Sequence, residues 1–347
     1  MWIYGPGPDL LIALCWVPLF ICGHVLSVRH GIQNDDLLRR VLAATFLVSF
    51  LHQPLTFPLV YGDSRQFQLH RRLFLWAPIA TVAVVSGLLA SHLWLLIPIA
   101  GLWNTWHTLQ QRYGLTRIYA RKSGYGSATL DRWVLYSWLV AAALVVAANP
   151  ATPGLIQRVG LDGINARAVR LLTDARPVAL ALLVPVGLMA LAFTVAIVVQ
   201  ERDRAAGMAA TGATINPARW VYQASSLLLI ASIAIDPAAG FIAYVGAHAI
   251  EYFVIVYKTT EKRYGADRDG AGAGLLARAA RTVGGRLGLL GGVSGLALLA
   301  HARLHGTTFN GVLYTVGALH FLYDGVIWKL RKPAVAADFA IRLPGRT

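Results

Sequence analysis

The sequence is poor in charged side chains, and the charges that it has are unequal in sign. Charged residues make up 14% of the 347 positions, whereas soluble domains carry about 25%. There are 31 Lys and Arg against 16 Asp and Glu. Hydrophobic residues reach 56%, and the mean hydropathy is +0.57. This composition excludes a disordered chain and a conventional soluble enzyme, and it predicts a polytopic membrane protein.

Cysteine is also scarce. Cys15 and Cys22 are the two cysteines, and they lie seven positions apart in one apolar run. On a helix this spacing corresponds to a rise of roughly 10 Å, which is too long for a disulfide. The spacing does not match a zinc motif either. We therefore expect both to be buried small hydrophobic side chains.

Apolar runs follow one another along the whole chain. A helix that crosses about 30 Å of hydrocarbon needs about 20 mostly apolar residues. Residues 1–347 are therefore expected to form a single integral membrane domain, an all-α bundle of about ten transmembrane spans. The predicted spans are Leu10–Val28, Val41–Val60, Leu73–Ala90, Leu93–Arg112, Trp133–Ala148, Val178–Val199, Trp220–Ile235, Gly240–Tyr257, Val283–Ala302 and Phe309–Leu330.

Basic residues cluster between these predicted spans, and cytoplasmic loops carry the excess of Lys and Arg in membrane proteins. With residues 329–332 inside, both termini, a Gly-rich loop at 258–282 and a tail at 333–347 are predicted to be cytoplasmic. The expected location is a bacterial-type inner or plasma membrane, with the lipid bilayer as a partner. We expect no nucleic acid, because no basic groove motif accompanies the charge.

Four of the ten histidines lie deep within predicted spans: His52, His107, His248 and His320. In the predicted topology each is about 15–21 Å from the outer end of its helix, at 1.5 Å per residue. Four spans thus place an imidazole in the same slab of the membrane, where ionisable groups are costly and mark functional sites. Three further histidines lie near span ends, and the sequence leaves open whether they join the site: His24, His301 and His305.

Three of the deep histidines are followed, three or four positions later, by an oxygen-bearing side chain: His248 by Glu251, His320 by Asp324, and His107 by Gln110 and Gln111. Residues at these spacings share a helix face, and imidazole and carboxylate suit iron, zinc or manganese. The predicted metal ligands are His52, His107, His248, Glu251, His320 and Asp324. The catalytic candidates are Glu251, Asp324 and Tyr323, and the residues predicted to orient the ligands are Tyr252, Tyr323, Tyr113 and Gln53.

Clustered histidines in a polytopic membrane chain resemble the integral-membrane non-haem iron oxygenases, which include the fatty-acid hydroxylase and desaturase group and the membrane carotene dioxygenases. This resemblance implies histidine-bound iron, oxygen activation and an apolar substrate. The chain departs from the hydroxylase pattern of paired histidine boxes, since only His301 and His305 form an HxxxH. One or two iron ions are the expected cofactor, with zinc, copper or haem as alternatives.

We therefore predict a membrane metalloenzyme, a non-haem iron oxidoreductase. It would use O₂ to hydroxylate, desaturate or cleave a lipophilic or membrane-accessible substrate, with an electron-donor protein at the cytoplasmic face. One alternative is a haem protein with two of the histidines as axial ligands, and another is a proton-coupled transporter that uses the same His, Glu and Asp side chains. A metal-free polar network and a non-catalytic assembly subunit are further alternatives.

Overall fold

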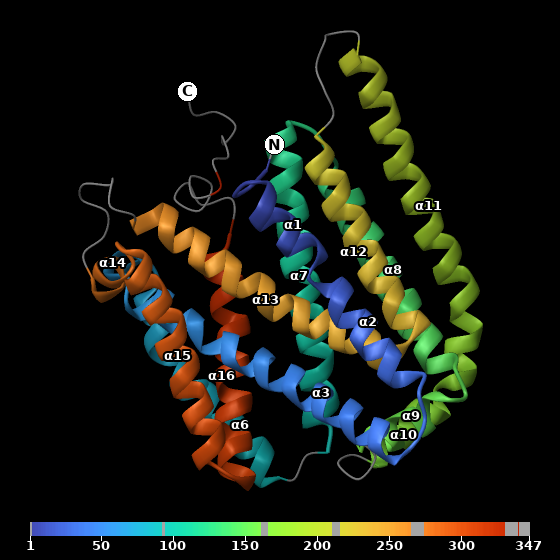
Figure 1. Cartoon of the computed structure of the whole chain (residues 1–347), viewed down its shortest axis with the longest axis horizontal. Helices are drawn as coiled ribbons and strands as arrows, with labels where there is room; N and C mark the ends of the chain where they lie inside the picture. Colours follow the sequence, from blue (N-terminus) through green and yellow to red (C-terminus); the bar gives the residue numbers. More distant parts are fainter. Residues whose placement is uncertain are drawn as a thin grey trace. The chain divides into compact units, whose positions relative to one another are not determined.

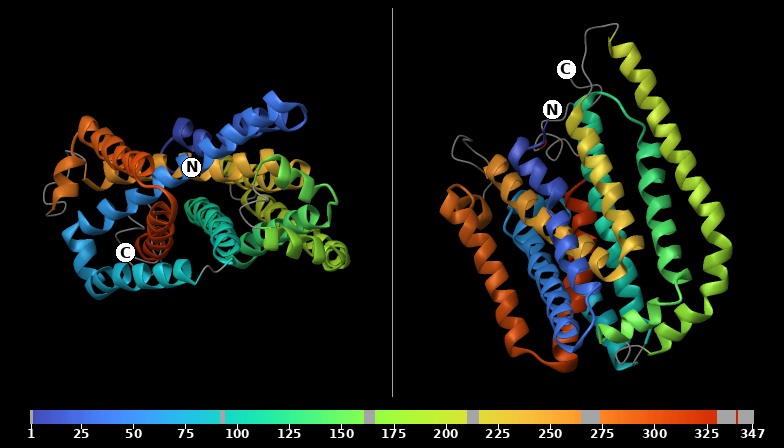
Figure 2. Two further views of the ribbon diagram at one scale, coloured as in Figure 1. Left: turned by 90° about the horizontal axis from the view of Figure 1, so that it is seen from below. Right: turned by 45° about the vertical axis from the view of Figure 1, so that its right-hand side comes forward.

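The computed structural model describes residues 2–91, 94–160, 166–209, 216–264, 274–329 and 339. All elements within these ranges are helical (Figures 1 and 2), which confirms the all-α prediction. The chain divides into two compact units: unit 1 is Met1–Thr45 and Gly101–His248, and unit 2 is Phe46–Ala100 and Ala249–Thr347. The deep histidines are therefore divided, with one pair in each unit.

Three helices contribute residues to both units: α3 (Ile32–His52), α7 (Leu96–Ser123) and α13 (Pro237–Tyr264). The other described helices of unit 1 are α1 (Pro6–Leu14), α2 (Trp16–Ser27), α8 (Ala128–Ala148), α9 (Thr152–Arg158), α10 (Ala166–Asp174), α11 (Arg176–Ala209) and α12 (Pro217–Ile235). Those of unit 2 are the 3₁₀ turn η1 (Gln53–Leu55), α4 (Thr56–Tyr61), α5 (Ser64–Leu69), α6 (Arg71–Ala90), α14 (Leu275–Ala279), α15 (Val283–Arg303) and α16 (Gly306–Ile327).

In unit 1, α8 packs against both α11 and α12, and these helices lie side by side in Figures 1 and 2. The indole N–H of Trp138 on α8 donates to Thr194 on α11 at 2.8 Å, and that of Trp16 on α2 donates to Ser225 on α12 at 2.8 Å. A buried indole needs such a partner for its N–H. These bonds therefore fix the neighbouring helices against one another.

In unit 2, α16 packs against α6 and α4 around an aromatic core. Tyr323 of α16 and Phe74 of α6 meet edge to face, with ring centroids 5.1 Å apart. Both side chains are almost completely buried. This core holds α16 in place, and α16 carries His320 and Asp324.

Polar caps and prolines determine where several helices begin. Asp63 accepts hydrogen bonds from two backbone N–H groups at the start of α5, each at 3.0 Å. Ser127 caps α8 and Thr282 caps α15 in the same way. Pro217 opens α12, where a missing N–H costs nothing. Local sequence thus explains these starts.

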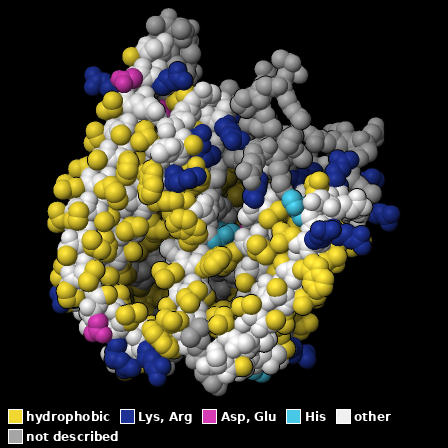
Figure 3. Space-filling model, turned by 180° about the vertical axis from the view of Figure 1, so that it is seen from behind, with side chains coloured by type: hydrophobic (Ala, Val, Ile, Leu, Met, Phe, Trp, Pro, Cys, Tyr) yellow, Lys and Arg dark blue, Asp and Glu magenta, His cyan; other side chains and the backbone are white. Residues whose placement is uncertain are grey.

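Eight helices are long and apolar enough to cross a membrane, so the bundle of ten spans is not confirmed. The two predicted spans outside this set are helices, α7 and α16, but their composition is more polar. They are also the helices that carry His107, His320 and Asp324. Figure 3 shows many hydrophobic side chains on the visible surface, with Lys and Arg in separate groups. Such a surface is compatible with an integral membrane protein.

The predicted cytoplasmic loop at 258–282 contains more helix than expected. Its first part continues α13 to Tyr264, and Leu275–Ala279 forms the short helix α14. Residues 265–273, which include most of the Gly-rich run, lie outside the described residues, as does the tail 333–347 apart from residue 339. Both cysteines are free thiols. Cys15 is buried as predicted, whereas the predicted burial of Cys22 is wrong, because Cys22 is exposed.

Candidate metal centre

The chain changes its helical geometry next to His52. Helix α3 ends at His52, the 3₁₀ turn η1 follows, and α4 begins at Thr56. Pro54 lies in this turn, and because it has no backbone N–H it cannot continue the α-helical hydrogen bonds. His52 and Thr56 are both fully buried, at 0% exposure. The break therefore places an imidazole and a hydroxyl in the interior of unit 2.

The Thr56 hydroxyl lies at the centre of a hydrogen-bond network in unit 2. Its Oγ1 is 2.6 Å from Nδ1 of His320, 2.7 Å from the Tyr252 hydroxyl and 3.1 Å from Oδ1 of Asp324. The Tyr252 hydroxyl donates to the same Oδ1 at 2.9 Å. Two hydroxyls thus hold one oxygen of Asp324 and one nitrogen of His320 in place.

The tautomer of His320 depends on which neighbour receives the Thr56 proton. The hydroxyls of Thr56 and Tyr252 have one proton each. Tyr252 donates its proton to Oδ1 of Asp324, and Thr56 also lies within hydrogen-bond distance of that oxygen. When Thr56 donates to Asp324, Nδ1 of His320 is the donor to Thr56, and the lone pair of His320 is on Nε2. When Thr56 donates to Nδ1 instead, the lone pair is on Nδ1.

The second oxygen of Asp324 faces that second nitrogen of His320. Oδ2 and Nε2 are 3.8 Å apart, which is too far for a hydrogen bond. Metal ions bind imidazole nitrogen and carboxylate oxygen at about 2.0–2.2 Å. The observed separation therefore suits a bridging cation.

His52 adds a second imidazole to this arrangement. Its ring meets the ring of His320 nearly at a right angle, with centroids 4.9 Å apart and an interplanar angle of 80°. A ring nitrogen of each lies within 4.8 Å of the other, a separation that one metal ion spans. The ring of Tyr252 packs on both, with centroids 5.2 Å from His52 and 5.0 Å from His320. In unit 2, His320 thus lies next to both the imidazole of His52 and the carboxylate of Asp324.

Unit 1 contains the other pair of deep histidines. The rings of His107 on α7 and His248 on α13 meet at 84°, with centroids 5.0 Å apart. The Gln111 amide donates to the backbone carbonyl of His248 at 3.5 Å. The two predicted ligands of unit 1 therefore lie next to each other. That the pairs of both units share one metal site stays a prediction.

The remaining predicted site residues lie in different surroundings. Glu251 on α13 is fully buried, and its role as a ligand stays a prediction. Tyr323 lies in the aromatic core of unit 2, where its hydroxyl is 2.6 Å from that of Tyr61. The hydroxyl of Tyr113 donates to the Ala128 carbonyl at 3.3 Å on an exposed part of unit 1. Of the predicted orienting residues, Tyr252 is the one hydrogen-bonded to Asp324.

Sequence reasoning missed Thr56 and Trp328. Thr56 follows His52 by four positions, the same spacing that separates Asp324 from His320. A hydroxyl is a weak metal ligand, so this spacing did not predict a role for Thr56. Trp328 caps the C-terminus of α16, and its ring meets that of Tyr252 with centroids 6.5 Å apart. Trp328 follows Asp324 by four positions, and this spacing is the one feature of the sequence that predicts their contact.

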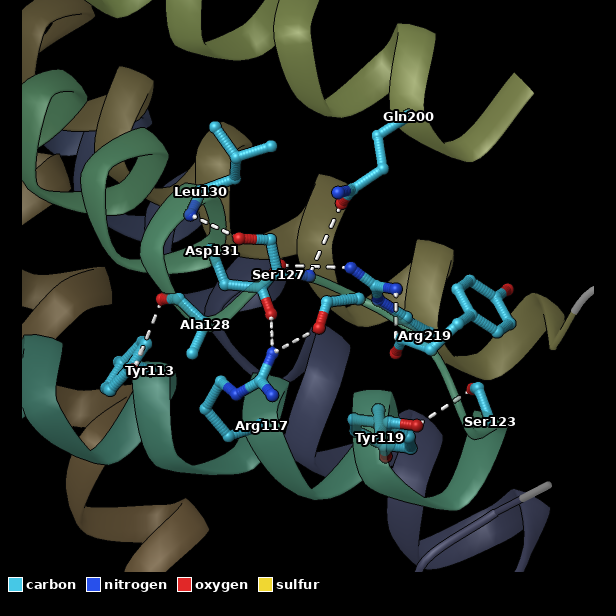
Figure 4. A network of polar contacts seen from close by, with 12 residues as sticks. Tyr113, Arg117, Tyr119, Ser123, Ser127, Ala128, Leu130, Asp131, Gln200 and Arg219 are labelled. Carbon is cyan, nitrogen blue, oxygen red and sulfur yellow. Dashed lines mark hydrogen bonds and ion pairs between the residues drawn. The ribbon is translucent and has the colours of Figure 1, made fainter. Parts of the chain in front are cut away.

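A second buried polar cluster, in unit 1, consists of paired charges (Figure 4). Asp131 is fully buried and contacts both Arg117 and Arg219, the latter at 3.0 Å. Arg219 also pairs with Glu201 at 2.5 Å. These opposite charges neutralise one another and join α7, α8, α11 and α12. The cluster is therefore a structural tie between helices, and Arg117 of the basic segment 117–122 belongs to it.

The turn before α8 fits closely around this cluster. Gly126 has a φ of +112°, and a Cβ at this position would lie 2.5 Å from the Arg219 guanidinium. The Tyr125 ring lies against the same guanidinium, with its centroid 5.1 Å away. Burial raises the pKa of the Tyr125 phenol, so this side chain stays neutral beside the ion pairs. Only glycine is compatible with both the backbone and the space.

Comparisons with known proteins do not place the chain in a family. No protein-family model, no curated protein and no solved structure matches it. The functional conclusion therefore depends on the side chains of the two units, and above all on the contacts of His320 with His52 and Asp324 in unit 2.

Proposed function

We propose that this protein is a membrane-embedded metalloenzyme whose metal ion is bound in unit 2 by His52, His320 and Asp324. The observation that supports this most strongly is the contact of two fully buried imidazoles, His52 and His320, with the Asp324 carboxylate next to His320, where Nε2 and Oδ2 are 3.8 Å apart. Two imidazoles and one carboxylate with open positions are the ligand set of non-haem iron(II) oxygenases. Iron is therefore the proposed metal.

The neighbouring hydroxyls support this proposal. Ligands of a catalytic metal are oriented by hydrogen bonds from residues behind them. With Thr56 accepting from Nδ1 of His320, Nε2 is left to bind the metal, while Tyr252 holds Oδ1 of Asp324 and leaves Oδ2 to bind. The site thus has both its ligands and their supports within one unit.

The geometry favours a metal ion over haem at this position. A haem iron bound by two histidines lies between them with the porphyrin ring separating the two imidazoles. The rings of His52 and His320 are instead in direct edge-to-face contact, with centroids 4.9 Å apart. No space for a porphyrin separates this pair. Transport by the same side chains stays an alternative, which uptake into proteoliposomes tests.

The proposed reaction is O₂-dependent oxidation of a lipophilic substrate. A bound iron would supply the binding and activation of O₂, and the long apolar helices suit a substrate that arrives from the bilayer. Hydroxylation and desaturation each require two electrons from a donor for every O₂ consumed. Oxidative cleavage of a carbon–carbon double bond requires none, because both oxygen atoms enter the products. Dependence on a donor therefore distinguishes these reactions.

Metal analysis of the purified full-length protein tests the proposal. We expect about one bound iron per chain, the stoichiometry of a single site with this ligand set. The His52→Ala and Asp324→Asn variants should lose it. His301→Ala is the matched control, because His301 lies in the same unit on the exposed end of α15. Wild-type protein that binds no transition metal after reconstitution would overturn the proposal.

A further inference from the structure

Two short helices of unit 2, α5 and α14, lie where long apolar helices end. Helix α5 connects α4, which ends at Tyr61, to α6, which begins at Arg71, and α14 lies between α13 and α15, which begins at Val283. The helices before and after each of them belong to candidate membrane spans. The backbone N–H of Leu276 on α14 donates to the Gly62 carbonyl, just before α5, at 3.1 Å. The two short helices therefore lie side by side, where these apolar helices end.

One face of each short helix packs on the interior of unit 2. Leu276 and Ala277 of α14 belong to its hydrophobic cluster, and Phe67 of α5 packs against the same cluster. The Asp63 carboxylate caps α5 through one oxygen, and its other oxygen accepts from the Tyr264 hydroxyl at the end of α13. These contacts determine which faces of α5 and α14 point outward.

The outward face of each short helix carries a leucine next to an arginine. In α5 these are Arg65 and Leu69, four positions apart, and in α14 they are Leu275 and Arg278, three positions apart. Residues at these spacings share a helix face. Leu69 is 63% exposed and Leu275 is 78% exposed. Apolar and basic side chains together on an exposed helix are typical of segments that lie at a membrane surface.

Three further exposed arginines lie close by in the sequence: Arg71 and Arg72 at the start of α6, and Arg281 just before α15. Within the part of the chain that the structure describes, none of the five arginine side chains makes a hydrogen bond or an ion pair. The described acidic side chain of these segments is Asp63, which is buried, and both of its oxygens already accept hydrogen bonds. Five positive charges are therefore available to an anionic partner.

We propose that this basic face, formed by Arg65, Leu69, Leu275 and Arg278 with the three neighbouring arginines, binds the headgroups of anionic phospholipids. Guanidinium groups bind phosphate through paired hydrogen bonds. The predicted topology places residues 258–282, and with them α14, in the cytoplasm, and the cytoplasmic leaflet carries anionic lipids. The exposed leucines favour a lipid over a soluble phosphate compound, because they contact the acyl chains below the headgroup. The proposed metal site has no part in this binding.

The C-terminal part of α11 in unit 1 offers a matched control. Arg202 and Arg204 are also exposed, but Glu201 and Asp203 lie next to them in the sequence. The double variants Arg65→Gln/Arg278→Gln and Arg202→Gln/Arg204→Gln remove the same charge from the chain. An effect of net charge alone would thus be equal in both, whereas the proposal requires the two variants to differ.

The test measures lipid binding to the full-length protein in a neutral detergent. The protein is titrated with phosphatidylglycerol or with phosphatidylcholine of the same acyl chains, and the bound lipid is counted by native mass spectrometry. Inorganic phosphate is then added as a competitor, which distinguishes a lipid site from a site for a soluble phosphate. Thermal unfolding in detergent alone confirms that each variant is folded.

We expect the wild type to bind phosphatidylglycerol in preference to phosphatidylcholine, and high salt to reduce this preference because it screens exposed charges. Each arginine near an anionic surface contributes about fivefold in affinity, so Arg65→Gln/Arg278→Gln should weaken the binding of phosphatidylglycerol about 25-fold. The Arg202→Gln/Arg204→Gln control should keep the wild-type affinity.

Three results would overturn the proposal. The first is equal binding of the two lipids by the wild type, or a preference that high salt leaves unchanged, and this result requires no substitution. The second is an equal loss of affinity in the two double variants, which would assign the effect to net charge. The third is displacement of phosphatidylglycerol by an equimolar amount of inorganic phosphate, which would assign the face to a soluble phosphate compound.

Discussion

The two units each contain a pair of buried histidines with nearly the same ring geometry, but the pairs have different neighbours. The ring centroids are 5.0 Å apart in unit 1 and 4.9 Å apart in unit 2, and both pairs meet nearly at right angles. In unit 2 the imidazole of His320 is hydrogen-bonded to Thr56, whose hydroxyl also contacts Tyr252 and Asp324. In unit 1 an amide contacts the backbone of His248.

This difference shows that the ring arrangement alone does not define a metal site. What distinguishes unit 2 is the support of the ligands, because a hydrogen bond at Nδ1 fixes which nitrogen of His320 has the lone pair. The His24–Asp236 pair in unit 1 shows the opposite arrangement, in which the histidine is hydrogen-bonded to the carboxylate itself. There Nδ1 bonds the carboxylate directly at 2.9 Å, so that the imidazole and the acid satisfy one another.

The largest effect is expected from removing the supported imidazole. His320→Ala should abolish binding of iron, because it deletes the ligand and leaves Asp324 facing an empty space. His248→Ala, the matched change in unit 1, should reduce binding less. Iron content after reconstitution, measured by elemental analysis, compares the two. An equal loss of iron in both variants would show that the two histidine pairs contribute equally to binding and would contradict the proposed difference between the units.

The ion cluster of unit 1 should dominate stability. Asp131→Asn removes a fully buried charge that pairs with two arginines, and breaking a buried pair costs about 3–5 kcal/mol. Asp36→Asn is the control, since Asp36 pairs with Arg39 on the surface and such pairs contribute about 0–1 kcal/mol. Unfolding in detergent measures both. Similar losses in the two variants would contradict the structural role of the cluster.

Loss of the Thr56 hydroxyl should weaken metal binding without abolishing it. Thr56→Val removes the acceptor for Nδ1 of His320, and residues behind metal ligands typically contribute about 10–100-fold in affinity. Thr260→Val is the control, because the Thr260 hydroxyl bonds only to carbonyls of its own helix, at 2.8 and 2.9 Å. Competitive metal titration measures the affinity. An unchanged affinity in Thr56→Val would rule out the assigned support.

The smallest effect is expected at His24. The His24 side chain is 43% exposed, and partly exposed ion pairs contribute about 0–1 kcal/mol. His24→Gln should therefore leave iron content unchanged and lower the free energy of unfolding by no more than that amount. A loss of iron in this variant would show that a His–Asp contact outside unit 2 takes part in binding.

Much of the fold was predictable from hydrophobic runs. All ten predicted spans fall on helices, because long apolar segments have few other stable conformations in a membrane. Helices α7 and α16 are too polar to be counted among the candidate membrane spans. Both carry candidate metal ligands, and these polar side chains lower the mean hydropathy of the two helices. The division into two units could not be predicted from the composition of the sequence, because it depends on which helix faces pack together.

The candidate site was predictable only in part. Spacing on one helix led to His320 and Asp324, and burial of both agrees with that prediction. The role of Thr56 depends on the helix break at Pro54. It also depends on contacts with distant residues, since Tyr252 is 196 positions and His320 is 264 positions away in the sequence. No local pattern encodes such contacts. Tyr323 is a predicted catalytic candidate, and the structure places it in the aromatic core of unit 2.

The most direct test of the central claim is pulsed electron paramagnetic resonance on protein loaded with Cu(II), which binds nitrogen and oxygen sites more tightly than the other divalent metals. Each coordinated imidazole produces a resolved nitrogen coupling. We predict imidazole couplings in the wild type, with one lost in His52→Ala and another in His320→Ala. A bound copper without imidazole coupling, or one whose couplings are unchanged in both variants, would contradict a metal site at His52, His320 and Asp324.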